Sequence, residues 1–449
     1  RAQIDYPNLY EGIDSFDKLR NSKLMITSDG KWESYYFPFY AFLCVPAKIV
    51  LQLLQLNQEL AFGITNILCV LSFFIVLMLS KKLLLVQKIL GIFLVMATPV
   101  FVYVQYVAAE TMVFSFVGIS ILLFYEKKYK SGALFITLAG LQNSTMMVIG
   151  MVFIADYYIH VLFDEKGKSI WQIIKEEFVP GIKFACCFLP CFLPFILKTI
   201  TGVKNFSPEA AVGEGIIKWL QRILAYLFDM NLGYFSFAPV LLISCIILFF
   251  YSLYLRNYRA ISFAAAFLGT IAAFSLMIHI NCGMPYCARY VFMLYPVLIV
   301  FMITTGFECM SHKIKYLVIN GLTIMTSMLL LAVNTNTYYV STTLNQLSEF
   351  VLNNVPVLYN PLHSTFNSRV SHIDVGYIFD TPVVYYDESG DARKILAKKE
   401  DAEELNLYYI AETDDAEWFR SKVSKLTENA SYISIPKHRR VIHAPEYQM

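Results

Sequence analysis

Hydrophobic residues in this chain occur in long blocks that short polar stretches separate. Most blocks contain roughly 20 residues, the length of helix that crosses a ~30 Å hydrocarbon core at about 1.5 Å per residue. The pattern predicts about ten membrane crossings, nine from blocks close to that length and one from a shorter block at 132–141. The predicted helices cover residues 60–80, 89–106, 109–125, 132–141, 143–162, 181–200, 236–255, 260–280, 288–307 and 315–336.

Basic residues mark alternate loops between these blocks. Short cytoplasmic loops of membrane proteins carry an excess of Lys and Arg, so these loops are predicted to face the cytoplasm. Loops 107–109, 201–235 and 281–288 are then external. The basic residues are Lys81, Lys82, Lys88, Lys127, Lys128, Lys130, Lys166, Lys168, Arg256, Arg259, Lys313 and Lys315.

The same alternation predicts two local features. Residues 132–162 must cross twice, with a tight outer turn around the polar run from Gly140 to Ser144. Residues 36–57 are predicted to form a juxtamembrane or re-entrant segment, because Pro38, Pro46 and Lys48 interrupt it.

Beyond about residue 340 the composition becomes polar. A period-two run from Tyr377 to Tyr386 and a helical stretch from Ala402 to Leu426 predict a small soluble α/β domain, external by the count of crossings. The predicted fold is therefore an all-α polytopic membrane protein with a small extracytoplasmic α/β C-terminal domain. Its parts are an external loop with juxtamembrane helices at 1–58, the transmembrane domain at 59–340 and the soluble domain at 341–449.

Composition supports a membrane protein and excludes some partners. The chain is 57% hydrophobic and 16% charged, with a mean hydropathy of +0.54, whereas soluble domains carry about 25% charge. A net charge of +2 gives no electrostatic reason to expect a nucleic-acid partner. The nine cysteines lie mostly in apolar runs, where a thiol acts as a small hydrophobe; Cys282 and Cys287 share one predicted outer loop.

Candidate chemistry gathers in the predicted external segments, and no Walker loop, GxSxG or HExxH motif is present. One cluster lies in 1–35, with Asp5 and the Asp29–Gly30 pair. The others are Glu110, the 201–235 loop with its amphipathic stretch from Ile216 to Phe228, and the run from His279 to Tyr290, where Arg289 begins a membrane helix.

Four runs resemble motifs of one family, in that family's order. They are Asp29–Pro38 with Tyr40 and Pro46, Gly233–Leu242, Gly283–Pro296, and Leu358–Pro361 with Phe366 and Arg369. They look like sequences of the GT-C superfamily of membrane glycosyltransferases, which use polyprenyl-phosphate sugars and include protein mannosyltransferases and aminoarabinose transferases. Cys287, Ala288 and Gln142 depart from the family pattern.

The resemblance implies a site on the outer face of a bacterial cytoplasmic membrane. An inverting enzyme would take a sugar from a polyprenyl-phosphate donor to a lipid, glycan or protein acceptor, and a divalent metal could assist. By this resemblance Asp5 is the base, preceded by a further membrane helix upstream, with Glu110 orienting acceptor or metal. Arg289 and Lys48 would bind the donor phosphate. The expected substrate-binding residues are Asp29, Tyr35, Tyr36, His279 and Tyr290.

Each residue also has an ordinary structural interpretation. Arg289 and Lys48 can snorkel from helix ends to the interface, and Glu110 can pair with a loop cation. Asp5 can be a solvated acid, Asp29 can shape a turn with Gly30, and His279 can be a packed polar residue.

Two other functions compete with sugar transfer. A transporter or flippase of lipid-linked glycans would show inverted repeats and charged or broken helices near the midplane, whereas here the polar residues gather outside. A membrane scaffold would need no converging acid and arginine.

Overall fold

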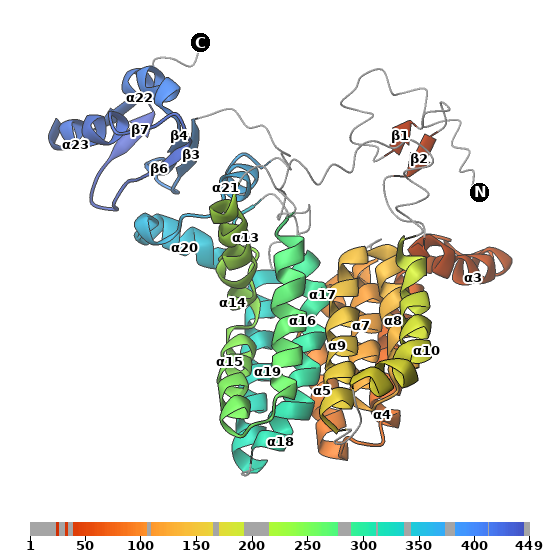
Figure 1. The fold of residues 1–449 in the computed structure, drawn as a ribbon. Helices are drawn as coiled ribbons and strands as arrows, with labels where there is room; N and C mark the ends of the chain where they lie inside the picture. The colour runs from red at the N-terminus through yellow and green to blue at the C-terminus, as the bar shows by residue number, and fades with distance from the viewer. Residues whose placement is uncertain are drawn as a thin grey trace. The chain divides into compact units, whose positions relative to one another are not determined.

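The computed structural model shows a mostly helical chain with a small sheet near its C-terminal end (Figure 1). It forms two compact units, of which the first comprises 1–88, 102–209 and 261–270, and the second 89–101, 210–260 and 271–449. The described residues are 24–26, 32–34, 39–105, 109–164, 170–192, 215–276, 289–310, 313–335, 343–372, 382–411 and 413–443.

Four helical spans among the described residues are long and apolar enough to cross a membrane. They indicate a multi-pass membrane protein, as the hydrophobic blocks predicted, while the full set of ten crossings stays a prediction. The four are Leu60–Leu79, Ser144–Val161, Arg289–Cys309 and Ile314–Val333. Shorter apolar helices are Phe39–Leu53, Leu85–Met96, Glu110–Tyr125, Pro239–Tyr254 and Arg259–Phe274.

The first unit is organised around α7 (Glu110–Tyr125), nearly all of whose residues are buried. It packs against α4 and α8, and α8 packs in turn against α9 and α10. Gly118 of α7 allows the close approach of α4, since a Cβ there would lie 2.5 Å from the ring of Phe73. The elements are β1 (Leu24–Ile26), β2 (Trp32–Ser34), α3 (Phe39–Leu53), α4 (Leu60–Leu79), α8 (Tyr129–Gln142), η1 (Ser144–Met146), α9 (Met147–Asp164), α10 (Ile170–Phe188) and η2 (Leu189–Phe192).

The two basic loops of the first unit that share a predicted side lie together. The backbone N–H of Lys81 donates to Glu126 Oε1 at 2.9 Å, and Lys82 Nζ donates to the Tyr125 carbonyl at 2.9 Å. Lys128 Nζ lies 2.6 Å from Glu126 Oε2. Loops 81–88 and 126–131 therefore occupy one end of this unit, as the charge alternation predicted.

One predicted span is wrong as a continuous helix. Residues 89–106 form α5 (Leu85–Met96) and α6 (Val100–Gln105) with a turn between them. Pro99 ends the regular ladder because it has no N–H and disfavours helical backbone at Thr98. The Thr98 hydroxyl bonds back to the Val95 carbonyl at 2.7 Å.

The predicted 181–200 helix also differs. The described helix α10 begins at Ile170 and includes Lys175 and Glu176, and it is followed by η2. Residues 193–200 lie outside the described part of the chain. The described part of the apolar block, 181–192, thus covers the second half of α10 and η2, and α10 begins earlier because its amphipathic periodicity extends beyond the purely apolar run.

The second unit contains a helix that is almost fully enclosed by protein. It runs from α17 (Arg289–Phe301) through a π-helical turn (Met302–Gly306) into α18 (Phe307–Cys309). In its most apolar stretch, 94% of the residues are buried inside the protein. It contacts α15, which also packs on α19. The other helices of this part of the unit are α13 (Ile216–Phe228), α14 (Tyr234–Phe237), α15 (Pro239–Tyr254) and α19 (Lys313–Thr335). Helix α16 (Arg259–Phe274) is divided between the two units.

The basic loop that contains Arg256 contacts the end of α18 at one end of the second unit. Asn257 Nδ2 donates to Glu308 Oε2 at 3.3 Å, and the Ser252 hydroxyl lies 3.1 Å from Cys309 Sγ. These contacts join the loop that contains Arg256 to the end of α18, next to the predicted basic loop at 313–315.

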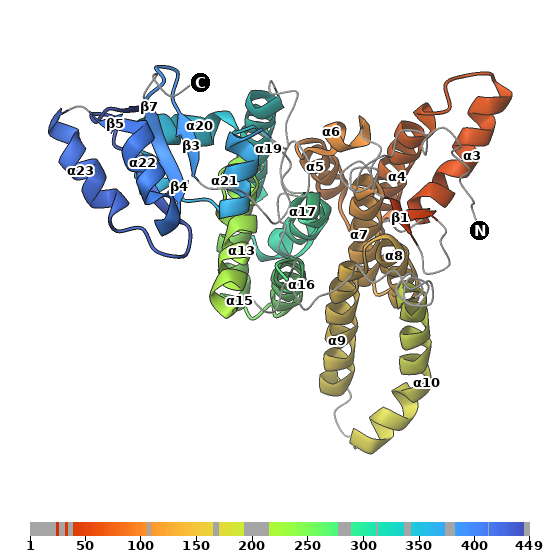
Figure 2. The ribbon, with the colours of Figure 1, turned by 90° about the horizontal axis from the view of Figure 1, so that it is seen from above.

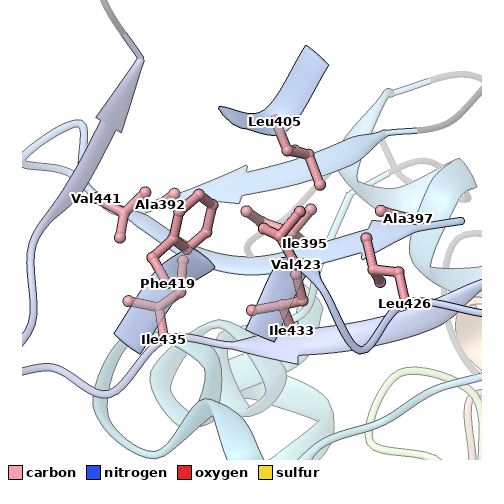
Figure 3. Close-up of a cluster of buried hydrophobic side chains, with 10 residues drawn as sticks. All are labelled: Ala392, Ile395, Ala397, Leu405, Phe419, Val423, Leu426, Ile433, Ile435 and Val441. Atoms are coloured by element: carbon pink, nitrogen blue, oxygen red, sulfur yellow. The ribbon is translucent and has the colours of Figure 1, made fainter. Parts of the chain in front are cut away.

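The C-terminal part of the second unit is a three-stranded antiparallel sheet of order β3-β4-β6 with helices on both faces (Figure 2). The central strand β4 is wholly buried, so alternate residues serve two cores. On one face Ile395 meets Leu405, Phe419 and Val423 (Figure 3). On the other, Leu396 joins a cluster from α20, η4 and α21. The elements are α20 (Gln346–Asn354), η4 (Pro356–Leu358), α21 (His363–Val370), β3 (Val383–Tyr386), β4 (Ala392–Ala397), η5 (Lys399–Asp401), α22 (Ala402–Tyr408), α23 (Thr413–Val423) and β6 (Ser431–Ser434).

The predicted helix from Ala402 to Leu426 is interrupted. Strand β5 (Tyr409–Ala411) separates α22 from α23 and pairs antiparallel with β7 (Val441–His443). Aromatic and β-branched residues at 409–410 suit a strand, and the distant partner decides between the two conformations. The predicted strand is found as Val383–Tyr386, while residues 373–381 lie outside the described chain.

We predict that Gly118→Ala lowers the free energy of unfolding by ~1–3 kcal/mol, because the added methyl must displace the enclosed Phe73 ring. The matched control is Gly321→Ala in α19, where a Cβ meets nothing within 4 Å and the change should be neutral or favourable by up to about 1 kcal/mol. Thermal unfolding of both purified variants measures this. Equal midpoints would contradict close helix packing at Gly118.

Candidate functional site

The structure describes four of the nine predicted site residues, namely Lys48, Glu110, Arg289 and Tyr290. The other five lie outside the described residues; they are Asp5, Asp29, Tyr35, Tyr36 and His279. Strands β1 and β2 pair antiparallel on either side of residues 27–31, which include Asp29.

In the first unit Glu110 is buried and is the first residue of α7. A carboxylate suits this position, because the helix dipole makes the N-terminal end positive. The short connection at 126–128 makes α7 and α8 an antiparallel pair, so the start of α7 and the end of α8 share one end of the unit. Gln142, the last residue of α8, accepts a hydrogen bond from the Tyr40 backbone N–H at 3.0 Å.

Asn143 caps the turn that follows α8. Its side chain accepts from the backbone N–H of Thr145 at 3.3 Å, where η1 begins. A tight turn is therefore found here, but it begins at Asn143, because α8 continues through Gln142 of the predicted turn 140–144. It lies at the opposite end of the α7–α8 pair from the basic loops.

Asn66 is a buried polar residue within the apolar helix α4 that sequence reasoning missed. It accepts from the Tyr40 hydroxyl at 2.9 Å and donates to the Val104 carbonyl at 3.3 Å. These bonds tie the start of α3 to α4 and α6. A lone Asn in an apolar block was the available signal, since polar groups in such helices are costly unless bonded.

Lys48 is exposed on α3 among exposed apolar side chains such as Val45 and Ile49. Long basic side chains on such a face can extend toward phosphate or toward water. The structure thus leaves Lys48 accessible to a phosphate, and no described side chain fixes it in one role.

In the second unit Arg289 and Tyr290 start α17. Arg289 Nη2 lies 3.3 Å from the Tyr290 hydroxyl, and its guanidinium carbon is 5.2 Å from the centre of that ring. The Tyr290 ring stacks on Phe274 with centroids 4.3 Å apart. The arginine is therefore positioned at the end of an apolar span against a rigid aromatic pair.

Gly233 and Tyr234 lie against the same helix start. The Tyr234 hydroxyl donates to the Val291 carbonyl, and its ring is 4.9 Å from that of Tyr295. Gly233 permits this turn, because a Cβ there would lie 2.7 Å from the Asp229 nitrogen. No side chain larger than hydrogen fits without moving backbone.

A buried polar network joins this turn to α20 and η4. Asp229 Oδ1 accepts from the backbone N–H groups of Asn231 and Leu232 at 2.8 and 3.0 Å. The Tyr359 hydroxyl donates to Asp229 Oδ2 at 3.2 Å, and Asn231 Oδ1 accepts from the Asn345 backbone N–H at 2.8 Å. We call Asp229, Asn231, Asn345 and Tyr359 the 229–359 network.

Burial and neighbouring groups act in opposite directions on the ionisation of this network. Burial raises the pKa of the Asp229 carboxyl, while its backbone donors and Arg369 act in the opposite direction. Arg369 is itself buried and donates from Nη1 to the Thr343 carbonyl at 2.6 Å. Burial likewise raises the pKa of Tyr359 well above its usual value, so its hydroxyl stays protonated and can donate.

Lys394 of β4 is fully buried next to the same segment. Its ammonium donates to the Pro356 carbonyl and to Asn360 Oδ1, both at 2.6 Å, and to the Ser434 hydroxyl at 3.1 Å. Burial lowers its pKa to about 7. Sequence reasoning missed Lys394, because the burial of β4 is visible only in the structure; lysines are seldom fully buried without partners.

The arrangement brings three separated runs together at one end of the second unit: 229–235, 289–295 and 345–369. It presents an arginine at the end of an apolar helix, which is suited to binding an anion. Among the described residues no group of His, Cys, Asp and Glu side chains could hold a metal ion.

Comparison with protein-family models, curated proteins and solved structures found no match to this chain.

We predict a pH-dependent contribution of Lys394 to stability. Its pKa is about 7 in the folded chain against an ordinary 10.5, so between these pH values the unfolded chain binds more protons. The free energy of unfolding therefore rises with pH across that window, by at most about 1.4 kcal/mol per pH unit from this group. Below pH 7 the buried ammonium is charged, so its full destabilising effect is present.

The measurement compares the slope of the unfolding midpoint against pH, from pH 7 to 9.5, in wild type and Lys394→Met. Trp418, which packs on the C-terminal core, serves as the fluorescent reporter with the other three tryptophans replaced by Phe. The variant should show the smaller slope. Identical slopes would mean that Lys394 does not titrate in this window.

Proposed function

We propose that this chain is a membrane glycosyltransferase that moves a sugar from a polyprenyl-phosphate donor to an acceptor at the outer face of the membrane. One observation carries the proposal. Tyr234, in one run that resembles a GT-C motif, donates to the Val291 carbonyl of a second such run at the start of α17. Tyr359, in a third such run, accepts a hydrogen bond from Asn231, two residues before the first run. The sequence separations of 57 and 128 residues across these two contacts give no reason for such a meeting.

The place of this meeting suits a lipid-linked phosphate. Arg289 stands at the first residue of the apolar span Arg289–Cys309, so its guanidinium lies where hydrocarbon gives way to headgroups and water. A polyprenyl phosphate places its charged group at that same boundary, with its chain in the bilayer. Arginine binds phosphate bidentately, which orients the group as well as neutralising it.

The fuller arrangement in this proposal follows the sequence predictions. The chain crosses the membrane about ten times, with the C-terminal domain outside and the basic loops in the cytoplasm. Asp5 is the base, and Glu110 orients the acceptor or a divalent metal. Lys48 assists Arg289 with the phosphate, while Asp29, Tyr35, Tyr36, His279 and Tyr290 line the substrate site.

The reaction balances with these groups. The acceptor hydroxyl oxygen forms a bond to the anomeric carbon while the bond between that carbon and the phosphate oxygen breaks. The hydroxyl proton passes to the Asp5 carboxylate, and the electron pair of the broken bond stays on the phosphate, where Arg289 stabilises the added negative charge. Attack opposite to the leaving phosphate inverts the configuration.

A transporter or flippase of lipid-linked glycans is the second candidate. The π-helical turn Met302–Gly306, with buried Thr304 and Thr305, interrupts the enclosed span, and broken helices often mark transport sites. The turn carries no charged residue, whereas a coupled transporter needs a group that binds an ion. Sugar transfer from a purified chain distinguishes the two functions, because a flippase releases no free polyprenyl phosphate.

We predict that Arg289→Ala lowers sugar transfer roughly 10- to 100-fold, the loss expected from charge-assisted hydrogen bonds worth ~1.5–3 kcal/mol. Arg289→Lys should lower sugar transfer less, because lysine keeps the positive charge and loses only the bidentate hydrogen bonding of the guanidinium. Release of polyprenyl phosphate in nanodiscs measures both. Arg259→Ala, which removes the first residue of another apolar helix, is the matched control and should retain activity. Full activity of both Arg289 variants would leave Arg289 as a snorkelling side chain.

A further prediction concerns the acids. Asp5→Asn should reduce transfer by 10²- to 10⁴-fold, the usual cost of losing a general base, while donor binding persists because the amide keeps the size of the side chain. Glu110→Gln should cost less if Glu110 orients the acceptor, and more if it holds a metal, in which case EDTA also inhibits wild type. Transfer by Asp5→Asn at the wild-type rate would move the search for the base to Glu110, Asp14 or Asp17.

A further inference from the structure

Helix α13 presents an apolar stripe that no described part of the chain covers. The side chains of Ile217, Leu220 and Leu224 are 70%, 47% and 55% exposed, and Ile216 and Phe228 are similarly exposed. Spacings of three and four residues place them on one side of the 13-residue helix. A soluble protein seldom leaves such a continuous stripe in water.

The opposite side of α13 is fixed to its own unit. Arg222 and Tyr226 are buried, and Arg222 Nε donates to the Ser275 carbonyl at 2.7 Å. Trp219 Nε1 donates to the Ala272 carbonyl at 2.9 Å. The exposed stripe therefore does not result from a detached helix, because the other face is held by specific bonds.

These bonds also fix where α13 lies. Ala272 and Ser275 are at the C-terminal end of the apolar helix α16, where carbonyl groups lack helical partners. An arginine that donates there complements the negative end of the helix dipole. Helix α13 is thus attached at the level where an apolar helix ends, which is the level of the membrane surface for a helix that crosses it.

The stripe continues into the surface of the helix that follows. The Phe228 ring lies 6.4 Å from that of Phe235, which is itself exposed. Beyond it α15 exposes Ile243, Ile247 and further apolar side chains. An apolar surface that runs from α13 onto an apolar helix matches one continuous apolar partner better than a separate protein.

Polar residues of α13 complete the pattern of an interfacial helix. Lys218 and Gln221 are exposed among the apolar positions. Helices that lie in the interface combine a buried apolar face with basic side chains that reach lipid phosphates. The partner that fits both features is membrane phospholipid.

We propose that α13 inserts its stripe of Ile216, Ile217, Leu220, Leu224 and Phe228 among phospholipids at the boundary between headgroups and acyl chains. The helix leads directly into Asp229 and Asn231, which bind Asn345 and Tyr359. Through the 229–359 network, α13 sets the height of α20 and η4 above the membrane. This role is independent of sugar transfer and holds for any function of the chain.

The test places a nitroxide label at Leu220→Cys, Leu224→Cys or Gln221→Cys, in a full chain whose native cysteines are replaced. Each position is exposed, so the labels leave the anchored face intact. Power saturation in phosphatidylglycerol–phosphatidylcholine nanodiscs compares access of oxygen, which concentrates in acyl chains, with that of a water-soluble nickel chelate. Labels at 220 and 224 should favour oxygen, and the label at 221 should favour nickel.

Three results would overturn the proposal. Equal nickel access at 220, 221 and 224 would place the stripe in water. Exclusion of both reagents at 220 and 224 would mean that protein, such as a second copy of the chain, covers it. Oxygen preference that appears only after polyprenyl phosphate is added would assign the stripe to the lipid carrier instead of phospholipid.

Discussion

The hydrogen bonds of Asp229 and Asn231 connect the helical and C-terminal parts of the second unit. A buried carboxylate and a buried amide are costly unless every oxygen is bonded, and here the partners come from the following turn, α20 and η4. Because Gly233 and Tyr234 follow at once, the same turn also fixes the start of α17. The geometry around Arg289 thus depends on a network in which backbone N–H groups and the Tyr359 hydroxyl donate to the Asp229 carboxylate.

The surrounding solvent explains why polar groups collect at the ends of each unit. Within a hydrocarbon core backbone and side-chain polar groups must be satisfied internally, and Asn66 meets this rule through Tyr40 and Val104. At the helix ends, water and lipid headgroups solvate charged groups, so the free-energy cost of placing a charge there is small. Lysines of the 81–88 loop bind Glu126 and helix-terminal carbonyls at one end, whereas Gln142 and Glu110 lie at the other.

The two ends therefore differ in chemistry as well as in charge. One end of the second unit joins short loops through Asn257 and Glu308. The opposite end carries a long segment, an aromatic-backed arginine and a folded sheet whose buried Lys394 binds three acceptors. Buried, hydrogen-bonded polar groups thus gather at one end of the second unit, as expected for a site where a charged ligand meets the membrane. This favours the proposed sugar transfer over a scaffold without a binding site.

The sequence by itself determined the positions of most helices and the grouping of the basic loops at one end. Both follow from local properties, namely the length of the apolar blocks and the charge of the loops. Ile216–Phe228 was predicted to the residue. The tertiary structure alone decided the break at Tyr409, where strand pairing with residues 441–443 overrides helical preference. It also decided which polar residues form the network, since Asp229 and Tyr359 lie 130 positions apart. Local patterns report burial and periodicity, but the partner of a buried polar group depends on the path of the whole chain.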